Sequence, residues 1–152
     1  MVIDKKIEAS VRSLLNAAVK SDESAFEDAA RSLSDGESQT KALELAVAIC
    51  LYVIFDTYDG KPTAGDVEEI AQAVVEMGSW ATLTSQEVSK FLGSVLNGKA
   101  LAEVFDPQSA FFLTFIITGS LLAASPKISK GEWWFNYLDR VEAAIETATS
   151  GK

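Results

Sequence analysis

The chain has 152 residues, of which 48% are hydrophobic, and this length suits one domain with a sizeable core. It has no histidine and one cysteine, Cys50, which excludes Ser–His and Cys–His nucleophilic pairs, an internal disulfide and a structural zinc site. The formal charge of −9 disfavours binding to nucleic acid or to anionic membranes. Phosphate-binding glycine motifs are also missing, so we expect a protein that is not an enzyme.

The N-terminal part predicts two amphipathic helices. Asp4 is placed to cap the first, whose apolar residues recur every three or four positions up to about Lys20. Ser21 or Asp22 is placed to cap the second, and Asp35-Gly36 is expected to close it. Charge begins at the fourth residue, where a signal peptide would be apolar, so we expect a cytoplasmic protein.

A third helix is expected over residues 38–55, where a long apolar run carries a single charge and must be buried on most sides. The turn-forming residues of the segment 56–62 predict a loop. Thr63 and Asp66 are spaced like an N-cap and its third-position acid, so a fourth helix should begin there and stop at Gly78.

A fifth helix is indicated by the capping-box residues Thr84 and Glu87, and Asn97-Gly98 supplies its stop. One short helical turn is expected within residues 100–105.

The most apolar stretch, residues 110–124, lies in a segment without any charge between Asp106 and Lys127. Asp106-Pro107 is a strong helix start and Ser125-Pro126 a helix end. A helix that is apolar on all sides must be buried by protein or by lipid.

The last helix is expected to follow a capping box formed by Ser129 and Glu132. Its expected inward stripe is Trp134, Leu138, Val141 and Ile145. Phe135 points away from that stripe, which is consistent with an interface anchor or with packing at a helix junction.

No segment shows the alternation typical of a strand. The sequence therefore predicts an all-α, single-domain bundle of seven or eight helices around two central apolar helices, at about 38–55 and 107–124. The domain should span residues 1–148, with a frayed tail over 149–152.

The negative charge is concentrated between Ser21 and Glu76, where thirteen acidic residues face three basic ones. Such a segment attracts a basic partner or a cation, and it equally serves as a solvated surface that keeps a protein soluble. The candidate partner-binding residues are Asp22, Glu23, Glu27, Asp28, Asp35 and Glu37, together with the aromatic Phe135.

Residues 46–69 and 115–132 share one order of features: an apolar helix, a turn-rich loop and a capped amphipathic helix. At Asp59-Gly60 and the acids after it, the first of these segments resembles the tellurite-resistance TerB family. The resemblance implies a small all-α protein of two helix-loop-helix halves whose Asp-Gly loops are associated with metal binding. The second loop departs from the family pattern, because Ser125-Pro126-Lys127 stands where Asp and Gly are expected.

The residues themselves also allow a metal site. Asp56, Asp59, Asp66 and Glu69 could offer hard oxygen ligands to Ca²⁺ or Mg²⁺, although their spacing does not meet the EF-hand template. Turn formation and helix capping explain the same acids without a metal.

Three functions follow from these patterns. The first is a non-catalytic, acidic binding protein that neutralises a basic partner protein, as immunity proteins and antitoxin-like inhibitors of toxins do. The second is a TerB-like, metal-associated stress-response protein. The third is a membrane-inserting helical protein, since a helix from Pro107 to Pro126 would be about long enough to span a bilayer. The polar residues of this segment argue against insertion into a membrane. Nucleic acid is not an expected partner, because the basic residues are scattered without a stacking platform.

Overall fold

The computed structural model describes residues 3–33, 35–77 and 83–150, and these form helices joined by short connections, without a strand. The elements in chain order are α1 (Lys5–Val19), α2 (Glu23–Arg31), α3 (Gly36–Tyr58), α4 (Ala64–Met77), α5 (Ser85–Leu96), the short 3₁₀-helix η2 (Leu101–Glu103), α6 (Pro107–Ala123) and α7 (Trp134–Ser150). The predicted all-α bundle is confirmed.

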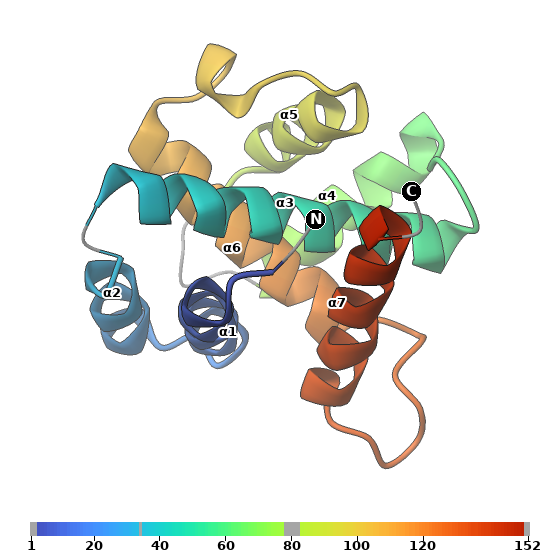
Figure 1. Ribbon diagram of the computed structural model, residues 1–152. Coiled ribbons are helices and arrows are strands. Elements are labelled where there is room, and N and C mark those ends of the chain that lie inside the picture. The colour runs from blue at the N-terminus through green and yellow to red at the C-terminus, as the bar shows by residue number, and fades with distance from the viewer. Residues whose placement is uncertain (1–2, 34, 78–82, 151–152) are drawn as a thin grey trace.

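Helices α3 and α6 form the centre of the bundle and run in the same direction across it (Figure 1). Their first residues, Gly36 and Pro107, line one cavity, and Tyr58 and Ala124 line another where they end. Ten residues of α6 are buried, on every side of the helix. A helix without a polar face has to be enclosed in this way, so the two predicted central helices are also confirmed.

The central pair lies between two groups of helices. Helices α1, α2 and α7 pack on one side, where α6 contributes Phe115, Ile116 and Leu122 to the core. Helices α4 and α5 pack on the other side, against Leu113 and Ile117 of α6. Each outer helix buries one apolar stripe, which is why each of them reads as amphipathic in the sequence.

Helix α1 approaches α6 closely at Gly119. A Cβ atom on this residue would lie 3.2 Å from the Cβ of Ala18 and 3.4 Å from the carbonyl oxygen of Leu15. The missing side chain is therefore what allows these two helices to pack at this distance.

Most of the predicted helix starts are confirmed by hydrogen bonds. The side chains of Asp4, Asp22 and Asp106 accept from backbone N–H groups in the first turns of α1, α2 and α6. Thr84 and Glu87 form the reciprocal capping box of α5. Local hydrogen bonds of this kind depend on a few neighbouring residues, so they can be predicted from sequence.

The prediction for Asp35-Gly36 is wrong. Helix α2 already ends at Arg31, and Asp35 is instead the N-cap of α3, accepting from the Ser38 N–H at 2.7 Å. An Asp-Gly pair suits either end of a helix, and here the apolar run that follows Gly36 decides in favour of a start.

Helix α3 also runs further than predicted, because residues 56–58 belong to it and not to a loop. The helix stops at Asp59, which adopts a left-handed conformation with φ 53°, followed by Gly60 with φ 140°. The expected loop therefore shrinks to residues 59–63.

The prediction that Ser129 and Glu132 open the last helix is wrong as well. Glu132 accepts from the Ser129 N–H, but the two residues close a turn and α7 begins only at Trp134. Asn136 caps the start instead, accepting from the Trp133 N–H at 3.1 Å. Gly131, at φ 86°, lies inside the turn from Ser129 to Glu132 and interrupts the helical path there. Helix α7 then continues to Ser150, into the segment 149–152 that was expected to be a frayed tail.

The expected stop of α4 at Gly78 lies outside the described residues, and the helix reaches Met77. No helix among the described residues is long and apolar enough to cross a membrane. The 17 residues of α6 extend over about 25 Å, which is short of the roughly 30 Å of a bilayer core.

Candidate partner-binding groove

The acidic residues predicted to bind a partner lie on α2 and at the start of α3, and all six are exposed. Helix α2 turns them outward because Phe26 is its inward anchor, with its ring 5.5 Å from Phe112 and 6.4 Å from Phe115. Asp28 pairs with Arg31, and Glu37 pairs with Lys41 at 3.2 Å. Glu23 and Glu27 have no basic partner among the described residues, so they add uncompensated charge to this face.

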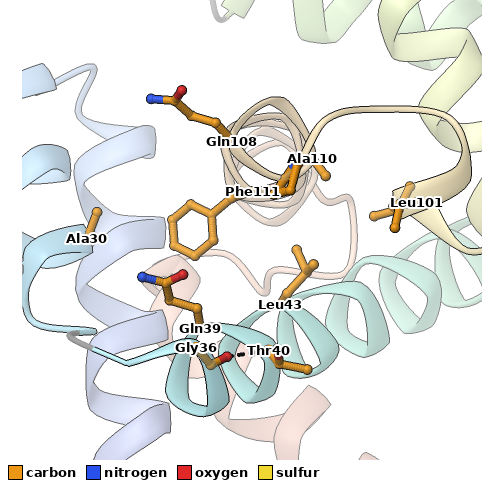
Figure 2. A pocket seen from close by; sticks show the side chains of 11 residues that line it. Ala30, Gly36, Gln39, Thr40, Leu43, Leu101, Gln108, Ala110 and Phe111 are labelled. Carbon is orange, nitrogen blue, oxygen red and sulfur yellow. Dashed lines mark hydrogen bonds between the residues drawn. The ribbon is translucent and has the colours of Figure 1, made fainter.

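A cavity of about 640 Å³ opens next to this face, between α2, the beginnings of α3 and α6, and η2 (Figure 2). We call it the groove. Its wall is mostly apolar, with Leu43, Leu101, Pro107 and Phe111 among the lining residues. Figure 2 shows Phe111 of α6 and Gln39 of α3 pointing toward one another across it.

Gln39 is one of three polar side chains among the residues that line the groove, with Thr40 and Gln108. Its amide nitrogen donates to the carbonyl oxygen of Leu33 at 3.1 Å, which joins the start of α3 to the segment after α2. The groove thus combines an apolar wall with an amide group at its edge, as is common in binding sites that recognise mixed apolar and polar groups.

The charge around the groove is negative. Five exposed acids are each adjacent in sequence to a lining residue, and we call them the acidic rim: Asp35, Glu37, Glu44, Glu103 and Asp106. Two basic residues, Arg31 and Lys41, are also next in sequence to lining residues. Arg31 pairs with Asp28, and Lys41 pairs with Glu37 of the rim, which leaves four of the five rim acids without an ion pair in the described chain.

Two members of the acidic rim are held in the ionised state. Asp35 accepts from the backbone N–H and the hydroxyl of Ser38, and these bonds lower the pKa of its carboxyl. Asp106 accepts from the same two groups of Ser109, with the same effect on its pKa. The charge of both residues is therefore present over the whole neutral range.

Phe135, the other predicted binding residue, does not lie among these acids. It is half-buried against the core, with its ring between those of Trp133 and Trp134. The Arg12 guanidinium lies 5.1 Å from the centre of the ring. The most exposed large hydrophobic residue of the described chain is Trp133, at 54%, two positions earlier than the residue that the sequence indicated.

The four acids predicted to bind a metal serve separate local roles. Asp56 accepts from the hydroxyl of Tyr137 at 2.7 Å, and Asp59 ends α3. Asp66 exchanges hydrogen bonds with Thr63 at the start of α4, and Glu69 follows one turn later. The described residues contain no group of three or more Cys, Asp or Glu side chains placed to hold a metal ion.

A second charged cluster, which sequence reasoning missed, joins α1 to α7. The guanidinium of Arg12 bonds to Glu8 at 3.0 Å, to Asp139 at 2.7 Å and to Glu142 at 3.2 Å. Glu142 is buried, and its Oε2 atom lacks a hydrogen-bond donor among the described residues. Burial and the facing Glu8 raise the pKa of Glu142 to about 8. The helical spacing of Glu8 and Arg12 hinted at a pair, but nothing local indicated the partners on α7.

No protein-family model, curated protein or solved structure matches this chain. Its function therefore has to be inferred from the chemistry of the groove and the charges around it.

Proposed function

We propose that this protein is a non-catalytic binding protein that neutralises a basic partner protein, in the manner of immunity proteins and antitoxin-like inhibitors. The observation that carries the proposal is the groove of about 640 Å³, which is mostly apolar inside and has five exposed acids next in sequence to its lining residues. An apolar cavity beside concentrated charge of one sign suits a ligand with the opposite charge around an apolar side chain.

The chemistry of the groove defines the segment that would bind. One apolar side chain would fill the space between Leu43 and Phe111, where its burial supplies the affinity. Lysine or arginine residues on either side of it would meet the acidic rim. The negative charge of the neighbouring α2 face would speed the encounter, and salt would weaken this effect.

The proposal is tested with a fluorescently labelled peptide that carries one leucine between lysines, titrated with the intact protein. We expect saturable binding that weakens as salt is added, and no binding of a peptide with glutamates in place of the lysines. Gln39→Arg places a like charge in the groove and should weaken binding at least about tenfold. Gln72→Arg, on the exposed face of α4, is the matched control.

The acidic rim is tested separately from the groove wall. Glu44→Lys/Glu103→Lys reverses two rim charges that do not cap a helix, and Glu76→Lys/Glu146→Lys makes the same change of net charge elsewhere on exposed positions. We expect the first pair to abolish peptide binding and the second to weaken it only slightly. Equal effects of the two pairs, or an unchanged affinity of Gln39→Arg, would contradict the proposal.

A further inference from the structure

The segment 124–133 between α6 and α7, which we call the Trp133 loop, is joined to α7 and to itself by several hydrogen bonds. Arg140 of α7 bonds to Glu132 through Nη1 at 3.0 Å and to the carbonyl oxygen of Lys127 through Nη2 at 3.1 Å. Glu132 in turn accepts from the Ser129 N–H, and the Lys127 N–H donates to the hydroxyl of Ser125. A loop with these bonds presents its side chains at low entropic cost.

The Trp133 loop presents an aromatic side chain together with positive charge. Trp133 is 54% exposed, and its ring lies 4.1 Å from that of Phe135, which supports it from behind. Lys127 and Lys130 are exposed and have no carboxylate within ion-pair distance in the described chain, since Glu132 is taken by Arg140. An exposed tryptophan beside free lysines is unusual on a chain of net charge −9 and has the composition of an interface anchor.

These are the features that the groove requires of a ligand. The groove offers a mostly apolar wall whose lining residues have the exposed acids of the acidic rim as sequence neighbours, and the Trp133 loop offers an exposed tryptophan together with two exposed lysines. The groove also has ample volume for an indole ring. The two surfaces are therefore complementary in polarity and in charge.

Within one molecule the two surfaces cannot meet. Pro107 at the beginning of α6 lines the groove, and the Trp133 loop follows the end of the same helix, about 25 Å away. Figure 1 shows the loop projecting from the end of the bundle opposite to the start of α6. Contact between them thus requires two copies of the chain.

We propose that the Trp133 loop of one copy docks into the groove of a second copy, so that the protein associates head to tail. This inference rests on the proposed function, because it uses the same groove. A head-to-tail contact leaves one loop and one groove free at the two ends, so it does not stop at a dimer. The charge of −9 repels the copies from one another, so the association requires concentrated protein. A basic partner that occupies the groove would separate the copies.

The test is sedimentation velocity of the full chain over a wide range of concentration. The wild-type protein should show a sedimentation coefficient that rises with concentration beyond the value of a dimer. Trp133→Ala removes the anchor and Gln39→Arg obstructs the groove, so each variant alone should remain monomeric. Phe55→Ala, which removes an exposed aromatic side chain from α3, should associate like the wild type.

Mixing the two monomeric variants gives the sharpest result. The intact loop of Gln39→Arg should bind the intact groove of Trp133→Ala, and the mixture should form a dimer and nothing larger. Lys127→Glu/Lys130→Glu changes only exposed side chains and should weaken the association at least about tenfold. This variant tests the same loop in case Trp133→Ala fails to fold.

A wild-type protein that stays monomeric, or a mixture that forms no dimer, would overturn the inference. If the lysine-leucine peptide still binds the groove in that case, the proposed function stands and only self-association fails. If neither the peptide nor a second copy binds, both fail. Binding of the Trp133 loop to vesicles of anionic lipid, without self-association, would also overturn the inference and assign the loop to a membrane surface.

Discussion

Glu142 of α7 is the one charged residue that the described part of the fold buries. Its Oε1 atom accepts from Arg12, while its Oε2 atom has no donor. When this carboxyl is protonated, its O–H group can donate a hydrogen bond to the carboxylate of Glu8, which faces it from α1. Burial first, and then the nearby Glu8 and Asp139, therefore raise the pKa of Glu142 to about 8, against the opposing effect of Arg12.

This raised pKa makes the stability of the protein depend on pH. The native state binds the Glu142 proton more tightly than the unfolded state, whose pKa is near the ordinary value of 4.5. The stabilisation is therefore complete below pH 4.5 and is lost as the pH rises through about 8. We expect Glu142→Gln to melt at a higher temperature than the wild type above pH 8, and the difference to vanish in acid.

Thermal unfolding of both proteins across this range checks the prediction. The difference between the two curves isolates Glu142 from acids such as Asp35 and Asp106, whose lowered pKa values act in the opposite direction. Glu76→Gln, which removes an exposed carboxylate on α4 outside this cluster, is a suitable control. A difference in melting temperature that does not change with pH would contradict the role of the buried proton.

At the scale of helices, the packing of α1 against α6 depends on Gly119. A leucine there would have to displace Ala18 and the α1 backbone, which lie within about 3.4 Å of the site of its Cβ. We expect Gly119→Leu to lower the free energy of unfolding by about 1–3 kcal/mol, as measured by urea denaturation.

Gly93 in α5 is a useful comparison with Gly119, because a substitution there is expected to stabilise the protein. It lies inside a helix, and a Cβ on it would meet nothing within 4 Å. Gly93→Ala should therefore raise the free energy of unfolding by about 0.5–1 kcal/mol, because alanine loses less backbone entropy in a helix. If Gly119→Leu leaves the free energy of unfolding unchanged or raises it, the close approach at Gly119 does not determine the packing.

The predicted metal site lies at the connection between α3 and α4. Its acids are spread over α3, the C-cap of α3 and the first turns of α4, and the resemblance to the TerB family stays a prediction. We expect Ca²⁺ or Mg²⁺ at about 1 mM to leave the melting temperature unchanged, since an ion that bound only the native state would raise it. A rise that Asp59→Asn abolishes would instead favour the metal-associated function.

At the scale of the whole molecule, the direction of α6 places the groove and the Trp133 loop at opposite ends of this helix. Helices α3 and α6 both begin at the groove, where the acidic rim gathers, and α6 ends at the basic Trp133 loop. The groove therefore suits a basic ligand with an apolar side chain, and the Trp133 loop has the features of such a ligand. Both proposals thus follow from the direction of α3 and α6.

The helical class, the two central helices and most helix starts could be read from the sequence alone. Period and capping involve residues within one or two turns of each other, and a helix such as α6 that is apolar on every side has to be central wherever the others lie. The helix ends were less predictable. The Asp-Gly pair at residue 35 and the capping-box residues at 129 and 132 fit more than one local structure.

The groove and the charged cluster were decided only by tertiary structure. The groove needs Ala30, Thr40, Leu101 and Phe111 brought together from four elements, and the bond from Arg12 to Asp139 spans 127 positions. Composition placed the negative charge between Ser21 and Glu76, but it could not show that acids outside this segment, Glu103 and Asp106, complete the rim. Such contacts depend on how the helices pack, and side-chain packing is not encoded in any short stretch of the chain.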